Sequence, residues 1–96
     1  MRLLGLFLAL SVQAADFDIG IRNARVADGT GAPLVEGSLG VKSGRIVAMG
    51  EVAGTADRVL DAKGRVAAPG FIDVHTHSED ICGNPVAENF LRMGVT

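Results

Sequence analysis

An apolar stretch that carries two histidines constrains the fold of this 96-residue chain more than any other feature. It runs from Gly70 to His77 and is entered through Ala68 and Pro69. A nearly continuous run of apolar and β-branched residues is typical of a strand buried on both faces, as in a parallel sheet covered by helices. We therefore predict a buried strand over residues 71–76.

The two histidines are spaced so that both can reach one metal ion. Side chains alternate between the faces of a strand, so His75 and His77 share a face and lie about 6–7 Å apart along it. Neutral imidazole suits zinc, and a catalytic zinc has three protein ligands and one position open for water. The spacing predicts His75 and His77 as metal ligands, and an incidental His-x-His pair on a strand is the alternative.

Other polar residues near the pair are weaker candidates. Asp73 shares the face of the histidines but lies lower in the strand, so we expect it to be structural or to orient an imidazole. The carboxylates of Glu79 and Asp80, in the following loop, either face a substrate or metal or form a solvated acidic turn. Cys82 is a conceivable ligand, but a free loop thiol beside Gly83 fits its position better.

The first fourteen residues have the organisation of a secretory signal. Arg2 supplies a short positive start, residues 3–12 an apolar core and residues 12–14 a small-residue cleavage pattern. About ten apolar residues fall short of the roughly 20 that span a bilayer. We predict a cleaved signal peptide at residues 1–14, export to a bacterial periplasm or the cell exterior, and no stable membrane anchor afterwards. A buried N-terminal strand is the alternative.

Charge and cysteine content narrow the choice of partners and fold. The chain has 9 basic and 11 acidic residues with a formal charge of −2, and its basic residues are scattered, so a nucleic-acid partner is not indicated. The single cysteine, Cys82, allows no disulfide within the chain. Removing 14 of the 96 residues leaves 82, which make a thin core. This size favours part of a larger structure.

Residues 15–68 are predicted to form an antiparallel β-domain segment, a small sheet or half of a sandwich, because short alternating stretches follow one another with turn signals between them. The expected strands are residues 17–22, 24–27, 38–42, 45–49, 58–61 and 65–68. The Ser43-Gly44 step and residues 62–64 are expected to join the last four of these into two hairpins.

Residues 69–96 are predicted to form the first strand, loop and helix of a barrel. Pro69 cannot donate to a sheet ladder, so the preceding strand should end there. The Asn-Pro step at residues 84–85 supplies a cap and a first helical position for a helix that ends near Met93. Residues 95–96 begin another β-prone run. This order is the opening unit of a (β/α) barrel or a related parallel sheet.

Several stretches of the chain together resemble one enzyme superfamily. Residues 68–77 closely resemble the metal-site strand of the amidohydrolases, and residues 21–26, 28–31 and 42–46 resemble the N-terminal β-segment of that superfamily. Within it, residues 75–80 and 88–96 are most similar to the N-acyl-D-amino-acid deacylases, also called D-aminoacylases.

The resemblance implies a small β-domain, built from both ends of a full-length chain, beside a (β/α)8 TIM barrel. It implies a zinc-dependent hydrolase in which metal-activated water cleaves the linear amide bond of a small-molecule substrate, an N-acyl-D-amino acid. His75 and His77 match the paired histidines after the first barrel strand of the family.

The rest of the family's machinery has no counterpart in these 96 residues. The deacylases use a cysteine after the second barrel strand, two later histidines and a later aspartate that acts as general acid and base. Cys82 lies in the first loop and does not match that cysteine. We therefore expect the 96-residue chain alone to be inactive. The alternatives are another amidohydrolase, dihydroorotase-like or dipeptidase-like, and a non-catalytic exported fragment.

Overall fold

The computed structural model describes residues 13–96, so most of the predicted signal peptide, residues 1–12, lies outside the described residues. Within residues 13–96, no helix is long and apolar enough to cross a membrane.

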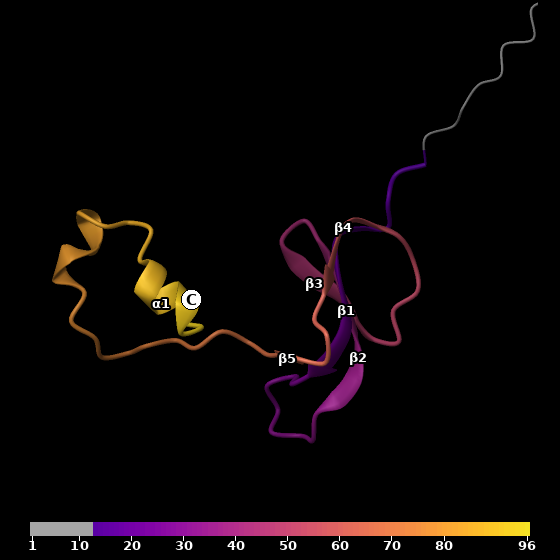
Figure 1. Cartoon of the computed structure of the whole chain (residues 1–96), viewed down its shortest axis with the longest axis horizontal. Coiled ribbons are helices and arrows are strands. Elements are labelled where there is room, and N and C mark those ends of the chain that lie inside the picture. The colour runs from indigo at the N-terminus through magenta and orange to yellow at the C-terminus, as the bar shows by residue number, and fades with distance from the viewer. Residues whose placement is uncertain (1–12) are drawn as a thin grey trace, which may run out of the picture.

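The larger part of the described chain is one five-stranded sheet (Figure 1). Its strands are β1 (Phe17–Val26), β2 (Val35–Lys42), β3 (Arg45–Gly50), β4 (Ala56–Asp61) and β5 (Val66–Ala67). The order is β3-β2-β1-β4, with β5 paired to β1 as well. The β1–β2 and β2–β3 pairs are antiparallel, whereas β4 and β5 run parallel to β1. The sheet is therefore mixed, and the expectation of an antiparallel sheet is wrong for these two pairs.

Strand β1 merges two of the predicted strands into one. The register of its pairing with β2 shifts between Ile21 and Ala24, where Asn23 has a φ of 55°. Such a bulge adds a residue to one strand and lets the ladder continue beyond it. Asparagine tolerates this left-handed conformation better than most residues, so the interruption predicted between the two stretches is a bulge and not a strand end.

The first predicted hairpin is confirmed. Strands β2 and β3 pair on either side of Ser43 and Gly44, whose φ angles are 51° and 73°. Positive φ at both central residues is the mark of a type I′ turn, the two-residue turn whose twist matches that of paired strands.

The second predicted hairpin is wrong, because β4 and β5 do not pair with each other. Both pair with β1 instead. The pairing of β4 ends with Asp61 opposite Arg22, and the pairing of β5 begins with Val66 opposite Arg25. The turn between them is bound to the β1 bulge, since the Gly64 N–H donates to the Asn23 carbonyl oxygen at 2.7 Å. The backbone of β1 therefore captures the turn, and the chain continues alongside β1 in the same direction.

The core of the sheet is small. Only Ala24, Val26 and Leu39 are buried among the described hydrophobic residues, and Ile21, Ala62 and Ala67 pack partly against them. Other apolar side chains of the sheet remain exposed, among them Ile46 and Met49. A sandwich needs a second layer facing this one, and residues 13–96 form a single layer.

The C-terminal segment leaves the sheet after β5 and contains a short 3₁₀ helix, η1 (Glu79–Cys82), and one helix, α1 (Glu88–Arg92) (Figure 1). Helix α1 begins later than the predicted residue 85 because Ala87 has a left-handed φ of 46°, and its N–H instead closes a turn with the Asn84 carbonyl oxygen at 3.1 Å. The predicted end near Met93 is confirmed.

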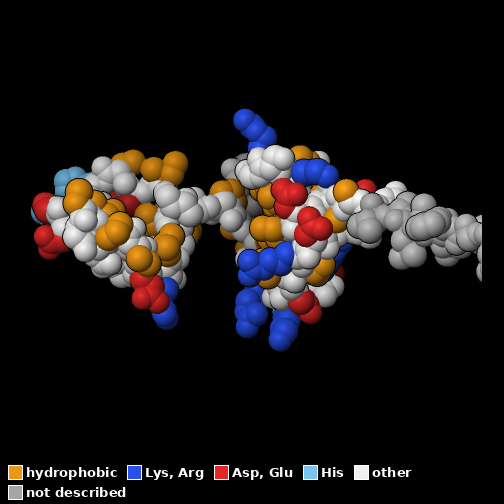
Figure 2. All heavy atoms as spheres, turned by 90° about the horizontal axis from the view of Figure 1, so that it is seen from above, with side chains coloured by type: hydrophobic (Ala, Val, Ile, Leu, Met, Phe, Trp, Pro, Cys, Tyr) orange, Lys and Arg blue, Asp and Glu red, His pale blue; other side chains and the backbone are white. Residues whose placement is uncertain are grey.

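The predicted buried strand at residues 71–76 does not form. Phe71 makes a single parallel bridge with Val95, while Ile72 is 81% and Val74 92% exposed. A parallel strand buried on both faces needs paired neighbours and covering helices. Among the described residues, this stretch is paired only through the bridge between Phe71 and Val95. The order of Phe71, α1 and Val95 follows the predicted β-α-β outline, but one bridge does not make a barrel unit. Figure 2 shows the apolar side chains that this leaves on the surface of the segment.

We expect Gly37→Ala to destabilise the sheet by about 1–3 kcal/mol, because overpacking forces backbone shifts. A Cβ atom at Gly37 would lie 2.9 Å from the Gly50 carbonyl oxygen and 3.1 Å from its Cα. Urea denaturation, followed by the NMR signals of the β2 backbone amides, measures the change in the free energy of unfolding. The matched control is Gly83→Ala, where the nearest atom is 3.4 Å away and φ is −84°, and we expect a change within about 0.5 kcal/mol. Equal midpoints for the two variants would contradict the packing argument.

We expect the Asp61 carboxyl to titrate below its ordinary pKa of 3.8, because it accepts hydrogen bonds from the Asn23 side-chain amide and the Lys63 N–H. A lowered pKa in the folded state means that this carboxylate stabilises the fold above the unfolded pKa, and that the contribution is lost as the pH falls through the lowered value. Asn23→Gly keeps positive φ accessible and should raise the Asp61 pKa toward 3.8. An NMR titration in which the variant leaves the Asp61 midpoint unchanged would contradict the contact.

Candidate metal centre

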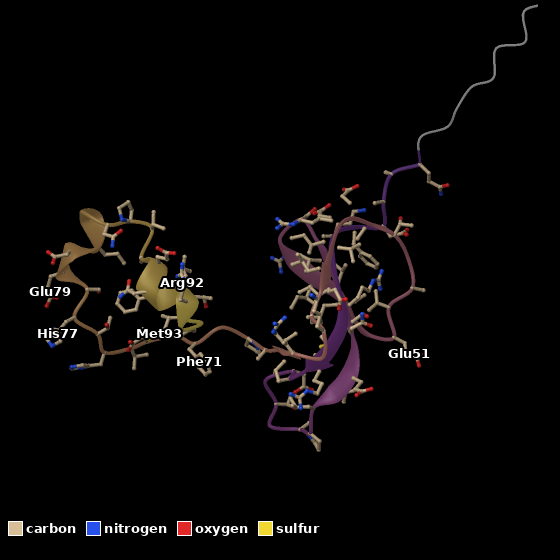
Figure 3. All side chains as sticks on the ribbon, viewed as in Figure 1. Glu51, Phe71, His77, Glu79, Arg92 and Met93 are labelled. Carbon is tan, nitrogen blue, oxygen red and sulfur yellow. The ribbon has the colours of Figure 1, made fainter. Side chains whose placement is uncertain are left out.

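The two predicted ligands lie close together in the exposed part of the C-terminal segment. The ring centroids of His75 and His77 are 6.5 Å apart and the ring planes are nearly perpendicular, at 87°. Both residues are exposed, and Figure 3 shows His77 at the far side of the segment from the sheet. The structure therefore brings the two imidazoles together, although the strand expected to align them does not form.

The chemistry of the pair suits zinc, but the two rings lie farther apart than two imidazoles bound to one zinc ion, so sharing a metal requires the side chains to rotate. Zinc–nitrogen bonds of about 2.0–2.1 Å at a tetrahedral angle place two ring centroids roughly 5 Å apart. The observed separation is 6.5 Å, and exposed side chains rotate readily between staggered rotamers. Neutral imidazole nitrogens are also common zinc ligands. The donor set is incomplete, since residues 13–96 hold no cluster of three or more potential metal ligands.

Asp73 binds the backbone and not an imidazole ring. Its Oδ1 accepts a hydrogen bond from the His75 N–H at 3.1 Å. This contact spans two residues, as in the local turns that aspartate side chains commonly form with their own backbone. Of the two roles expected for Asp73, this contact with the backbone favours the structural one.

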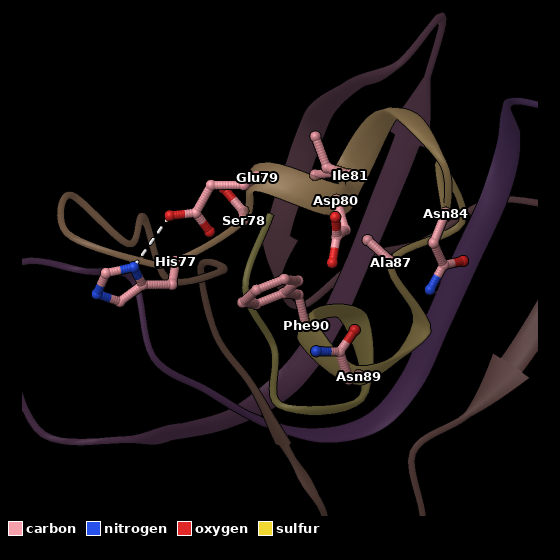
Figure 4. A pocket seen from close by; sticks show the side chains of 9 residues that line it. All are labelled: His77, Ser78, Glu79, Asp80, Ile81, Asn84, Ala87, Asn89 and Phe90. Atoms are coloured by element: carbon pink, nitrogen blue, oxygen red, sulfur yellow. Dashed lines mark hydrogen bonds and ion pairs between the residues drawn. The ribbon is translucent and has the colours of Figure 1, made fainter.

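Glu79 contacts a histidine ring, which the sequence left open. Its Oε1 lies 3.0 Å from Nδ1 of His77 (Figure 4). The Glu79 backbone N–H and the His77 ring lower the pKa of the Glu79 carboxyl, in that order of effect. A carboxylate only accepts hydrogen bonds, so Nδ1 of His77 must donate, and a neutral ring then has its lone pair on Nε2. Glu79 therefore contacts one of the predicted ligands while its side chain remains largely exposed.

Beside this contact, the loop and helix α1 enclose a small hollow of about 180 Å³ (Figure 4). It is lined by His77, Ser78, Glu79, Asp80, Ile81, Asn84, Ala87, Asn89 and Phe90. Cys82 is a free, exposed thiol and does not line the hollow, in agreement with the expectation for a loop cysteine. The hollow places polar side chains next to His77.

Comparison with known proteins shows which enzymes the sequence is similar to. The chain is 47% identical over 84 residues to an N-acyl-D-aspartate deacylase of Alcaligenes xylosoxydans xylosoxydans, a match that covers 85% of this chain and 17% of that enzyme. The chain matches the N-acyl-D-amino-acid deacylases of the amidohydrolase superfamily. No protein-family model matches it.

A solved deacylase structure has the same fold over the matched region. The N-acyl-D-glutamate deacylase from Bordetella bronchiseptica, complexed with zinc and a phosphonate mimic of the tetrahedral intermediate, superimposes with a TM-score of 0.76 at 41% identity. The superposition covers 83% of this chain and 17% of that enzyme. The deacylase match therefore extends from sequence to structure.

The matched segment also occurs outside the deacylases. A D-hydantoinase from Ralstonia pickettii is 42% identical over 67 residues, which cover 70% of this chain and 14% of that enzyme. The chain spans about a sixth or less of the length of these relatives.

Proposed function

We propose that this chain is the N-terminal part of a zinc-dependent amidohydrolase that hydrolyses the amide bond of N-acyl-D-amino acids. The observation that carries the proposal is the pair His75 and His77, which lies with its rings 6.5 Å apart within a segment that matches the deacylases. The zinc-containing deacylase structure supports the same metal here.

His75 and His77 would hold the metal together. Bound zinc supplies a Lewis acid and lowers the pKa of water, so that a nucleophile for an amide carbonyl is present near neutral pH. In the overall reaction, water adds across the amide C–N bond and releases a carboxylic acid and the free amine of the D-amino acid. Asp73 holds the backbone before the pair through the His75 N–H, which limits the positions that the first imidazole can take.

Further ligands come from other parts of the enzyme in this proposal. A catalytic zinc uses three protein ligands, and residues 13–96 offer two histidines without a third group beside them. The resemblance to the deacylases also implies that the acid and base of the reaction lie outside this chain.

The surface of the chain supports a fold that continues beyond it. We infer that the sheet is one layer of a β-sandwich and that residues 69–96 open a (β/α)8 barrel. Apolar residues are exposed on both parts, with Ile46 at 62%, Ile72 at 81% and Val74 at 92%. Apolar surface of this extent on a small chain is typical of a face that packs against another element.

We also propose export. The charge, apolar core and cleavage pattern of residues 1–14 support a signal peptide, which places the enzyme in the periplasm or outside the cell.

The function is tested on the full-length enzyme of which this chain is proposed to be the N-terminal part. We expect the purified, zinc-loaded protein to hydrolyse N-acetyl-D-aspartate, N-acetyl-D-glutamate or another N-acyl-D-amino acid. The matched L-enantiomers are the control and should react much more slowly. A chelator should remove the activity and added zinc restore it. Hydantoins, tested in parallel, separate the deacylase function from that of the D-hydantoinase relative. No turnover of any N-acyl-D-amino acid would overturn the deacylase assignment.

The 96-residue chain provides a second test. We expect it to show no amide hydrolysis when loaded with zinc, because two ligands without an acid and base are not a catalytic site. Release of free D-amino acid, measured with a D-amino acid oxidase assay, detects any activity. Measurable turnover by the purified chain would contradict the proposed division of the site.

We expect His75→Ala and His77→Ala in the complete protein each to lower bound zinc and to reduce kcat/KM by more than roughly 100-fold, since even the outer partners of metal ligands are worth 10–100-fold. Cys82→Ser is the matched control and should keep both values, because Cys82 is not a ligand in this account. Elemental analysis and steady-state kinetics measure the two effects. Zinc content and turnover at the unsubstituted level in either histidine variant would refute that ligand.

A further inference from the structure

The contact between Glu79 and His77 determines which nitrogen of the ring is free. Oε1 of Glu79 lies 3.0 Å from Nδ1 of His77. Because the carboxylate can only accept, the contact selects the neutral tautomer that carries its proton on Nδ1 and its lone pair on Nε2. A metal ion can bind only the nitrogen that has the lone pair.

The loop places Glu79 at this position through its own backbone hydrogen bonds. Glu79 is the first residue of η1, whose opening turn is closed by the Ile81 N–H donating to the Ser78 carbonyl oxygen at 3.0 Å. The Asn84 N–H, donating to the Asp80 carbonyl oxygen at 3.1 Å, holds the other end. The neighbouring carboxylate of Asp80 makes no ion pair or hydrogen bond with either histidine in the described structure.

We propose that Glu79 is a positioning residue, which orients the His77 ring and fixes its tautomer so that Nε2 faces the metal. The inference rests on the proposed function, since it assigns a role around the same metal. Histidine ligands of metals characteristically donate their other ring N–H to a carboxylate, a carbonyl or water, and this partner sets both the ring orientation and the basicity of the ligand. The 3.0 Å contact between Glu79 Oε1 and His77 Nδ1 is of this kind.

The contact is too exposed to serve the stability of the fold. The side chains of His77 and Glu79 are 88% and 76% exposed, and exposed ion pairs contribute little to folding stability. Removal of the carboxylate should therefore change metal binding and leave the fold intact. This difference separates a positioning role from a structural one.

The test compares Glu79→Ala with the matched control Asp80→Ala in the 96-residue chain. Each substitution removes one carboxylate and one negative charge from the same loop. Both are made with Cys82→Ser, so that the thiol cannot compete for zinc. The first readout is the ¹⁵N spectrum of the His77 ring without metal at a pH of about 8, well above the ordinary pKa of free imidazole. The second is zinc affinity, from a ZnCl₂ titration followed at the histidine rings.

With Glu79 present, we expect the His77 ring to carry its proton on Nδ1. Glu79→Ala should shift the ring toward the other tautomer and weaken zinc binding by roughly three- to fivefold, the upper range for an exposed contact. Asp80→Ala should keep the tautomer and change the affinity by less than about twofold. An unchanged ¹⁵N spectrum in Glu79→Ala, or equal effects of the two substitutions, would overturn the positioning role.

Failure of this inference is distinguishable from failure of the proposed function. His77→Ala reports on the metal site itself, since it should abolish zinc binding that depends on the pair. If His77→Ala weakens binding while Glu79→Ala does not, only the positioning role is refuted. If neither substitution changes zinc binding, the metal site is wrong as well, and the inference that rests on it is overturned too.

Discussion

Backbone pairing along β1 is the constraint on which the rest of the structure depends. One edge of this strand binds β2, and the other binds β4 and then β5. The bulge at Asn23 accepts the turn that separates β4 from β5 and holds it through Asp61 and Gly64. Because β5 is bound at the end of β1, the chain leaves the sheet at a defined point, just before Pro69, and this determines where the histidine segment starts.

The chemistry of the chain lies in the part with the least structural support. The sheet has three buried hydrophobic residues, and the C-terminal segment has none among the described ones. Each histidine has one local contact: Asp73 accepts from the His75 N–H, and Glu79 contacts the His77 ring. Local contacts can orient two ligands, but a rigid catalytic site needs neighbours that pack around it. The proposed enzyme supplies these neighbours from outside this chain.

The features that the sequence predicted correctly are those set by local chemistry. The Ser43-Gly44 turn, the helix end near Met93 and the proximity of the two histidines all depend on residues close in sequence. The parallel pairing of β4 and β5 was missed because their partner in β1 is about forty residues away. Strand formation at residues 71–76 was overpredicted for a related reason, since a β-prone run becomes a strand only when partners are present.

The contact of Glu79 with His77 depends on how the loop folds, so a two-residue spacing alone could not reveal it.

The central claim, that the histidine pair is the metal-binding part of this chain, is tested most directly by zinc-edge X-ray absorption on the 96-residue chain with one equivalent of zinc. The account predicts two imidazole nitrogens at about 2.0–2.1 Å with oxygen in the remaining positions. A sulfur ligand at about 2.3 Å, or the absence of imidazole scattering, would contradict it.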